Sequence, residues 1–159
     1  TLAVPGKSFL TASRLRRTNY QKYLADLAER YGLEDKIEFL GSLSAEEMKQ
    51  AFLDANVFVL PSTIENSPNS LGEAMLLGVP CVAADVGGVT TMLRHGLEGE
   101  VYPSAAPYML AFYVETIFAR REAAEVLGAA ARAHAGVTHD QEKNLADLLE
   151  IYKSLATEG

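Results

Sequence analysis

The spacing of apolar and polar residues along the chain predicts alternating strands and helices. Short, nearly uninterrupted apolar runs are typical of strands in a parallel sheet, and they occur at residues 2–6, 36–40, 56–60, 81–84 and 99–102. Apolar residues at steps of three and four predict helices at residues 19–31, 44–55, 70–77, 105–119, 121–135 and 140–156, and Gly87-Gly88 opens a shorter helix that stops at Gly96. The order of these elements predicts an α/β fold, a doubly wound parallel sheet with helices on both faces.

Local signals support several of these boundaries. Gly32 is suited to end the first helix, and Ser44 with Glu47 has the spacing of a capping box. Ser70 and Glu73 have the same spacing, so they predict a second capping box. Residues 7–18 are polar and basic and are expected to form a loop; their cations are Lys7, Arg14, Arg16 and Arg17.

Composition narrows the classes of function. The chain has 159 residues, of which 48% are apolar, so a single globular domain with a real core is expected. A formal net charge of -7 argues against a general nucleic-acid binder and against a surface that binds anionic lipid.

The single cysteine, Cys81, lies in an apolar run and is expected to be buried and inert, as in a reducing compartment. No apolar run approaches the roughly 18 residues of a membrane span. We therefore expect a cytoplasmic protein, with peripheral attachment to the inner membrane as a further option for the full-length form. The chain starts within an apolar segment and without Met, so we expect it to be a piece of a longer protein.

The candidate site lies in residues 61–88, PSTIENSPNSLGEAMLLGVPCVAADVGG. This stretch leaves a predicted strand, crosses a polar loop and enters a helix. In doubly wound sheets ligands bind beyond the carboxyl ends of the strands. Two acids, Glu65 and Glu73, flank the start of that helix, and we interpret them as ligand-binding residues.

The chemistry of the stretch suggests a division of roles. The amides of Ser70, Leu71 and Gly72 are expected to be free at the helix start, where the helix dipole favours a diphosphate. Glu73 could accept hydrogen bonds from a ribose diol and Glu65 from a sugar, because bonds to carboxylates are strong. The alternatives are that Glu73 only caps its helix and that Glu65 is an exposed loop acid.

At these residues the chain resembles GT-B glycosyltransferases, specifically the retaining glycosyltransferase family 4. That family carries a Glu, seven residues and a second Glu, seen here as Glu65-NSPNSLG-Glu73. The likeness extends from about residue 20 to the end. Its other segments are IEFLG (37–41), NVFVLPS (56–62), Gly78-Val-Pro80, Asp85-Val-Gly87-Gly88 and HGLEG (95–99).

The resemblance implies that residues 1–159 are part of the C-terminal, donor-binding domain, which takes a nucleoside-diphosphate sugar. It implies that Glu65 is the catalytic residue at the donor sugar and that Glu73 contacts the ribose. The other implied donor contacts are Asn69, Ser70 and Leu71 at the diphosphate and Gly41, Ser42 and Leu43 at the base. The family usually needs no metal or other cofactor. In agreement, His95, His134 and His139 have no metal-ligand spacing, and His134 and His139 look structural.

The chain departs from the family pattern in several places. The family's Gly-Phe-Gly is replaced by Asn66-Ser67-Pro68, and Pro68 offers no amide. The first strand of the domain, with its following Arg and Lys, and the N-terminal acceptor domain are not found. In a sheet of order 3-2-1-4-5-6 that strand is central, so the remaining strands should pair directly or the fragment should self-associate.

The leading hypothesis is therefore the donor-binding half of a retaining glycosyltransferase acting on a saccharide or lipid-linked acceptor, with polysaccharide assembly as its setting. Two alternatives stay open: a nucleotide-sugar epimerase of the same architecture, and a non-enzymatic α/β interaction module. The chain contains neither GxGxxG nor GxxxxGK[ST], so dinucleotide-binding and P-loop enzymes are not supported.

Overall fold

The structure is a computed structural model that describes residues 1–11 and 13–157. The chain divides into two compact units, Thr1–Gln50 and Ala51–Gly159. Helix α2 (Ala45–Asp54) contains the boundary between them. Its predicted capping box is present: the Glu47 amide donates to Ser44 Oγ at 3.4 Å, and the Ser44 amide donates to the Glu47 carboxylate at 2.8 Å.

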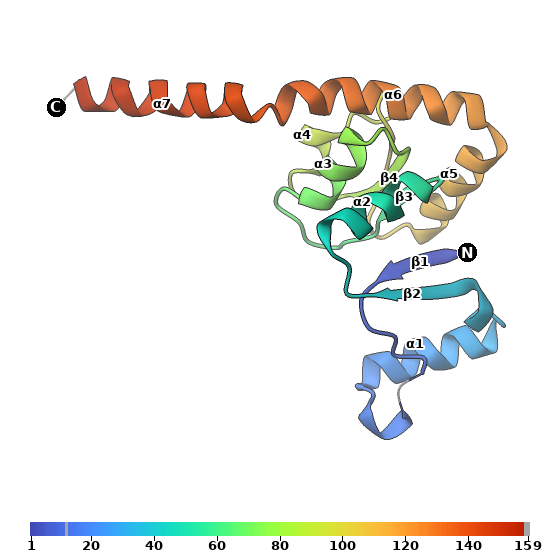
Figure 1. Ribbon diagram of the computed structural model, residues 1–159. Coiled ribbons are helices and arrows are strands. Elements are labelled where there is room, and N and C mark those ends of the chain that lie inside the picture. Colours follow the sequence, from blue (N-terminus) through green and yellow to red (C-terminus); the bar gives the residue numbers. More distant parts are fainter. Residues whose placement is uncertain (12, 158–159) are drawn as a thin grey trace. The chain divides into compact units, whose positions relative to one another are not determined.

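The first unit holds a two-stranded parallel sheet and one long helix. Strand β1 (Leu2–Pro5) pairs with β2 (Ile37–Gly41), with Leu2 opposite Ile37 and a register shift between Val4 and Pro5. Helix α1 (Asn19–Arg30) connects them and lies beside the sheet (Figure 1). Two short 3₁₀ segments, Arg14–Arg16 and Glu34–Lys36, complete the unit.

Helix α1 has well-defined ends. The amide of Gln21 donates to Thr18 Oγ1 at 3.2 Å and the Thr18 amide donates to Gln21 Oε1 at 3.0 Å, which forms a capping box. Gly32 follows the helix with a φ of +61°, as expected for a C-terminal glycine.

The second unit contains the larger sheet, in which every pairing is parallel. Its order is β3-β4-β5, so β4 is central and pairs with both neighbours. The strands and helices that follow α2 are β3 (Phe58–Leu60), α3 (Asn69–Leu76), β4 (Cys81–Asp85), α4 (Val89–Met92), β5 (Glu100–Pro103), α5 (Pro107–Ala119), α6 (Arg121–Thr138) and α7 (Gln141–Thr157).

The core of this unit lies on both faces of β4. On one face Val82 and Ala84 pack with Tyr102 of β5 and Ile117 of α5. Helix α3 contacts β3 and β4 and buries Leu71, Ala74 and Met75, and α6 packs over α3 (Figure 1). The sheet therefore has helices on both faces, and the predicted α/β class with parallel strands is confirmed.

The described strands form two parallel sheets, one in each unit: β1-β2 in the first and β3-β4-β5 in the second. β3 is only partly buried, because within the described sheet it pairs on one side only. The predicted helix at 87–96 is a single turn, Val89–Met92.

The described helices include none whose length and apolar content would allow it to span a bilayer.

Candidate functional site

Glu65 lies in the loop that leaves β3, and its carboxylate is held locally. The Ser62 hydroxyl donates to Glu65 Oε1 at 2.7 Å, and the side chain is partly buried. The hydrogen bond fixes one carboxylate oxygen and leaves Oε2 able to accept bonds from a ligand. Ser62, three residues before Glu65, is a hydrogen-bond partner that the sequence analysis missed.

The start of α3 corrects two predictions. The helix begins at Asn69, its N-cap is Pro68, and no side chain caps it, so the capping box of Ser70 and Glu73 is wrong. The reason is that the helix starts one residue early, which puts Ser70 inside its first turn. Glu73 therefore does not cap the helix.

The earlier start also changes which amides are free. The amides of Leu71 and Gly72 donate to the Pro68 carbonyl at 3.0 and 3.4 Å, so they are not free as expected. Within the described residues, the N–H groups of Asn69 and Ser70 have no hydrogen-bond partner. The positive end of α3 therefore presents the Asn69 and Ser70 amides, while the Leu71 side chain is fully buried.

Glu73 is exposed on the second turn of α3. Its carboxylate has no hydrogen-bond or ionic partner among the described residues. A free, solvated carboxylate one turn from free helix amides can accept hydrogen bonds from a vicinal diol without breaking an internal contact.

The residues expected at the base belong to the first unit. Gly41 ends β2 with a φ of +73°, and its amide and carbonyl both bond to Gly6, at 3.1 and 2.7 Å. Its amide is therefore already used inside the unit. Ser42 is exposed and Leu43 is partly buried, so these two residues carry the backbone groups available to a ligand.

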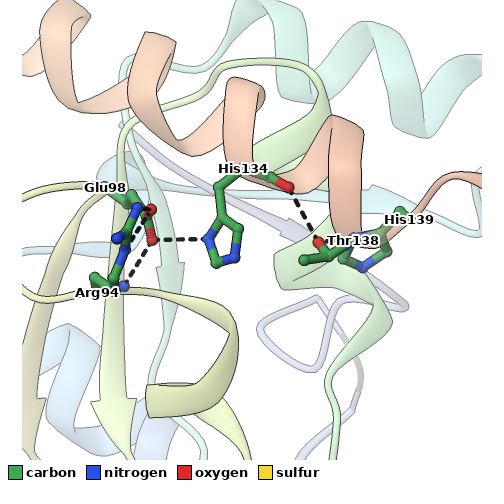
Figure 2. Close-up of polar contacts among 5 residues, drawn as sticks. All are labelled: Arg94, Glu98, His134, Thr138 and His139. Carbon is green, nitrogen blue, oxygen red and sulfur yellow. Dashed lines mark hydrogen bonds and ion pairs between the residues drawn. The ribbon is translucent and has the colours of Figure 1, made fainter.

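An ionic cluster around a buried glutamate lies between α6 and the loop before β5 (Figure 2). Within the described residues, Glu98 is the one charged side chain that is almost wholly buried, at 1% exposed. Arg94 Nε donates to Glu98 Oε1 at 2.7 Å, a second Arg94 nitrogen contacts the same oxygen, and the Arg94 amide donates to Oε2 at 3.0 Å. His134 Nδ1 lies 2.9 Å from Oε2.

The protonation of this cluster follows from its contacts. Burial alone would raise the pKa of Glu98, but the bonds from Arg94 and His134 outweigh it and hold the pKa below its usual range. Because an ionised carboxylate only accepts, His134 Nδ1 carries the proton. The cluster joins the loop before β5 to α6, and the sequence analysis missed it because an acid and a histidine 36 positions apart give no local signal.

His95 has a different arrangement. Its Nδ1 lies 3.1 Å from both the Val101 amide, which donates to it, and the Glu100 carboxylate. A single Nδ1 cannot both accept a hydrogen bond from the Val101 amide and donate one to the Glu100 carboxylate, so only one of these two contacts is a hydrogen bond at a time. Burial raises the pKa of Glu100 and the nearby His95 opposes that effect.

Within the described part of the chain, no three potential ligands gather into a metal site.

Three comparisons place these features among known proteins. The family model described as "Glycosyl transferases group 1" matches residues 6–134. A D-inositol 3-phosphate glycosyltransferase of Geodermatophilus obscurus is 34% identical over 137 residues, which cover 86% of this chain and 30% of that protein.

Two solved structures have the same fold. Sucrose-phosphate synthase from Thermosynechococcus elongatus aligns with a TM-score of 0.84 and 25% identity, over 99% of this chain and 39% of that one. Anabaena HepE in complex with UDP-glucose aligns with a TM-score of 0.76 and 25% identity, over 93% of this chain and 40% of that one. The chain thus spans less than half the length of each of these proteins.

Proposed function

Since the chain belongs to the Glycosyl transferases group 1 family, we propose that it is the donor-binding part of a retaining glycosyltransferase of family 4. In this proposal the whole enzyme transfers a sugar from a nucleoside-diphosphate sugar to a saccharide or lipid-linked acceptor in polysaccharide assembly. The acceptor domain and the first strand of the donor domain belong to the longer protein.

One observation carries the proposal. The loop and first turn of α3 combine a carboxylate held by Ser62, two amides without partners and a second carboxylate without partners. These groups occur in the order Glu65, Asn69–Ser70, Glu73, which matches the order sugar, diphosphate, ribose along a nucleotide sugar. HepE, a structural relative, was solved with UDP-glucose, which supports a donor of that kind.

The proposed mechanism depends on charge stabilisation. As the bond between sugar and diphosphate breaks, negative charge grows on the diphosphate oxygens. The Asn69 and Ser70 amides and the dipole of α3 stabilise that charge, so the leaving group departs without a protein nucleophile. The acceptor hydroxyl oxygen forms the new bond to the sugar, and its proton passes to the departing diphosphate. Glu65 Oε2 orients the donor sugar and Glu73 the ribose. We expect the reaction to proceed without a bound metal, because the helix start supplies the positive potential.

Variants of the two glutamates in the full-length transferase test this proposal. Glu65→Gln and Glu73→Gln should each lower sugar transfer by at least about 10²-fold, the cost of losing a well-placed charged contact. Glu122→Gln is the matched control. Glu122 is exposed in the first turn of α6, on the order of 20 Å along that helix from its C-terminal turn. Because its side chain is exposed, its replacement by Gln should not disturb the fold. Circular dichroism should show that all three variants fold.

The outcomes separate the alternatives. An unchanged transfer rate in Glu65→Gln and Glu73→Gln would reject the site, whereas no transfer by the unaltered full-length protein would leave an interaction module. Epimerised donor formed without acceptor would indicate the epimerase. An inverted anomeric configuration in the product, read by NMR coupling constants, would contradict the retaining mechanism. Activity lost in EDTA and restored by a divalent cation would contradict the metal-free mechanism.

A further inference from the structure

Gly87 and Gly88, in the turn between β4 and α4, lie directly against the backbone of the Glu65 loop. A Cβ placed on Gly87 would come within 1.6 Å of the Glu65 carbonyl oxygen, and one on Gly88 within 2.1 Å of the Asn66 carbonyl oxygen. Both distances are far below the roughly 3.5 Å of an ordinary contact. Any side chain here must displace backbone, because the clashing atoms are not the ends of flexible side chains.

The contact is also a hydrogen bond. The Gly88 amide donates to the Asn66 carbonyl at 2.8 Å, so the approach that excludes a Cβ is the one that forms this bond. Gly87 has a φ of +52°, in the left-handed region that favours glycine. Two independent properties of this turn, its close approach and its backbone conformation, therefore require glycine.

The Glu65 loop is thus held from two directions. Ser62, at the end of β3, holds the Glu65 carboxylate. The β4–α4 turn holds the Asn66 carbonyl through the Gly88 amide, and Gly87 packs closely against the Glu65 carbonyl. Ser67 Oγ also lies 3.6 Å from Met92 Sδ, which adds a weak contact to α4. The position of the Glu65 backbone is therefore set by the turn that follows the neighbouring strand.

We propose that Gly87 and Gly88 are positioning residues for Glu65: they fix where its carboxylate meets the donor sugar while leaving the nucleotide contacts unchanged. The inference rests on the proposed function, because it takes Glu65 as the sugar-binding residue. It extends that function by separating the sugar half of the site, which depends on the β4–α4 turn, from the ribose half, which Glu73 carries on α3.

Steric displacement gives the size of the effect. Relieving the clash of a Gly88 Cβ requires a shift of more than about 1 Å at the Asn66 carbonyl. A misplacement of about 1 Å at a reacting centre costs on the order of 10²-fold in rate. Gly88→Ala should therefore lower kcat by about 10²-fold, whereas the KM for UDP-glucose and the affinity for UDP alone should change by less than about 3-fold.

A double-mutant cycle in the full-length transferase tests the inference, with UDP-glucose as the probe donor and calorimetry of UDP binding. Gly88→Ala in a Glu65→Gln background should cause no further loss of kcat, since it acts through Glu65. Gly136→Ala is the control, because no atom lies within 4 Å of its added Cβ and it should keep full activity. A Gly88→Ala variant with unchanged kcat, or a double variant whose losses multiply, would overturn the inference.

The inference and the proposed function fail in different ways. If Glu65→Gln itself leaves transfer unchanged, the role of Glu65 is wrong. If Glu65→Gln abolishes transfer but Gly88→Ala does not affect it, only the positioning role is wrong.

Should Gly88→Ala not fold, amide hydrogen exchange of Gly88 in the unaltered enzyme takes its place. UDP-glucose should slow that exchange more than UDP does, because only the sugar engages Glu65. Equal exchange with both ligands would reject the inference.

Discussion

Replacing Gly128 by alanine is expected to weaken the packing of α6 on α3, the helix that carries Glu73. A Cβ at Gly128 would come within 2.2 Å of the Gly78 carbonyl oxygen and 3.1 Å of its carbonyl carbon, in the turn that follows α3. Reaching an ordinary contact distance requires α6 and this turn to separate by about 1 Å. Gly136, in the same helix, has open space around an added Cβ, so it is the matched control.

The pair of substitutions isolates the steric energy. Alanine in place of glycine stabilises a helix by about 0.5–1 kcal/mol at either position. Overpacking at Gly128 costs about 1–3 kcal/mol. Gly136→Ala should therefore raise the free energy of unfolding by that helix term, and Gly128→Ala should lie about 1–3 kcal/mol below it.

Urea unfolding followed by circular dichroism measures both variants. Equal midpoints and equal slopes for Gly128→Ala and Gly136→Ala would mean that α6 does not approach the Gly78 turn as closely as the structure shows. A lower midpoint for Gly128→Ala with an unchanged slope is the expected result, because a change in midpoint alone reports stability.

Three further predictions concern a charge, a thiol and a helix cap. Glu98→Gln should lower the free energy of unfolding by roughly 1–3 kcal/mol at pH 7. Because the folded pKa of Glu98 is depressed, the stability difference from the wild type is complete above the ordinary carboxyl pKa and should fade in urea titrations as the pH falls below it. A difference that does not change with pH would contradict the ionised cluster. Burial raises the pKa of the Cys81 thiol to about 12, so a disulfide reagent should label it only after unfolding, and fast labelling of the native protein would show an open core. Thr18→Ala should remove the capping box of α1 and destabilise the first unit by about 1 kcal/mol by the same urea assay, and an unchanged midpoint would show that the cap contributes nothing.

Strong local signals predicted the elements well. The 3.6-residue period located α1, α5, α6 and α7, and the Ser44–Glu47 spacing located the start of α2. The apolar run at 81–84 located the central strand, because a strand buried on both faces needs no polar residues. These features depend on neighbours along the chain, which a sequence displays directly.

The errors occurred where geometry depends on a single residue or on distant partners. Ser70 and Glu73 had the right spacing for a capping box, but Pro68 became the N-cap and moved the helix start. That shift removed the amides of Leu71 and Gly72 from the expected set of free donors, kept that of Ser70 and added that of Asn69. The Glu98–His134 contact and the packing of Gly88 on Asn66 join residues far apart in sequence, so no local pattern could reveal them.

The central claim is that a nucleotide binds at the start of α3 between Glu65 and Glu73. Titrating this chain with UDP and with GDP while recording amide chemical shifts tests it most directly. The account predicts that the largest shifts occur at residues 65–73, above all at the Asn69 and Ser70 amides, and that Glu73→Gln weakens binding. Saturating shifts confined to other residues, with 65–73 unchanged, would contradict it.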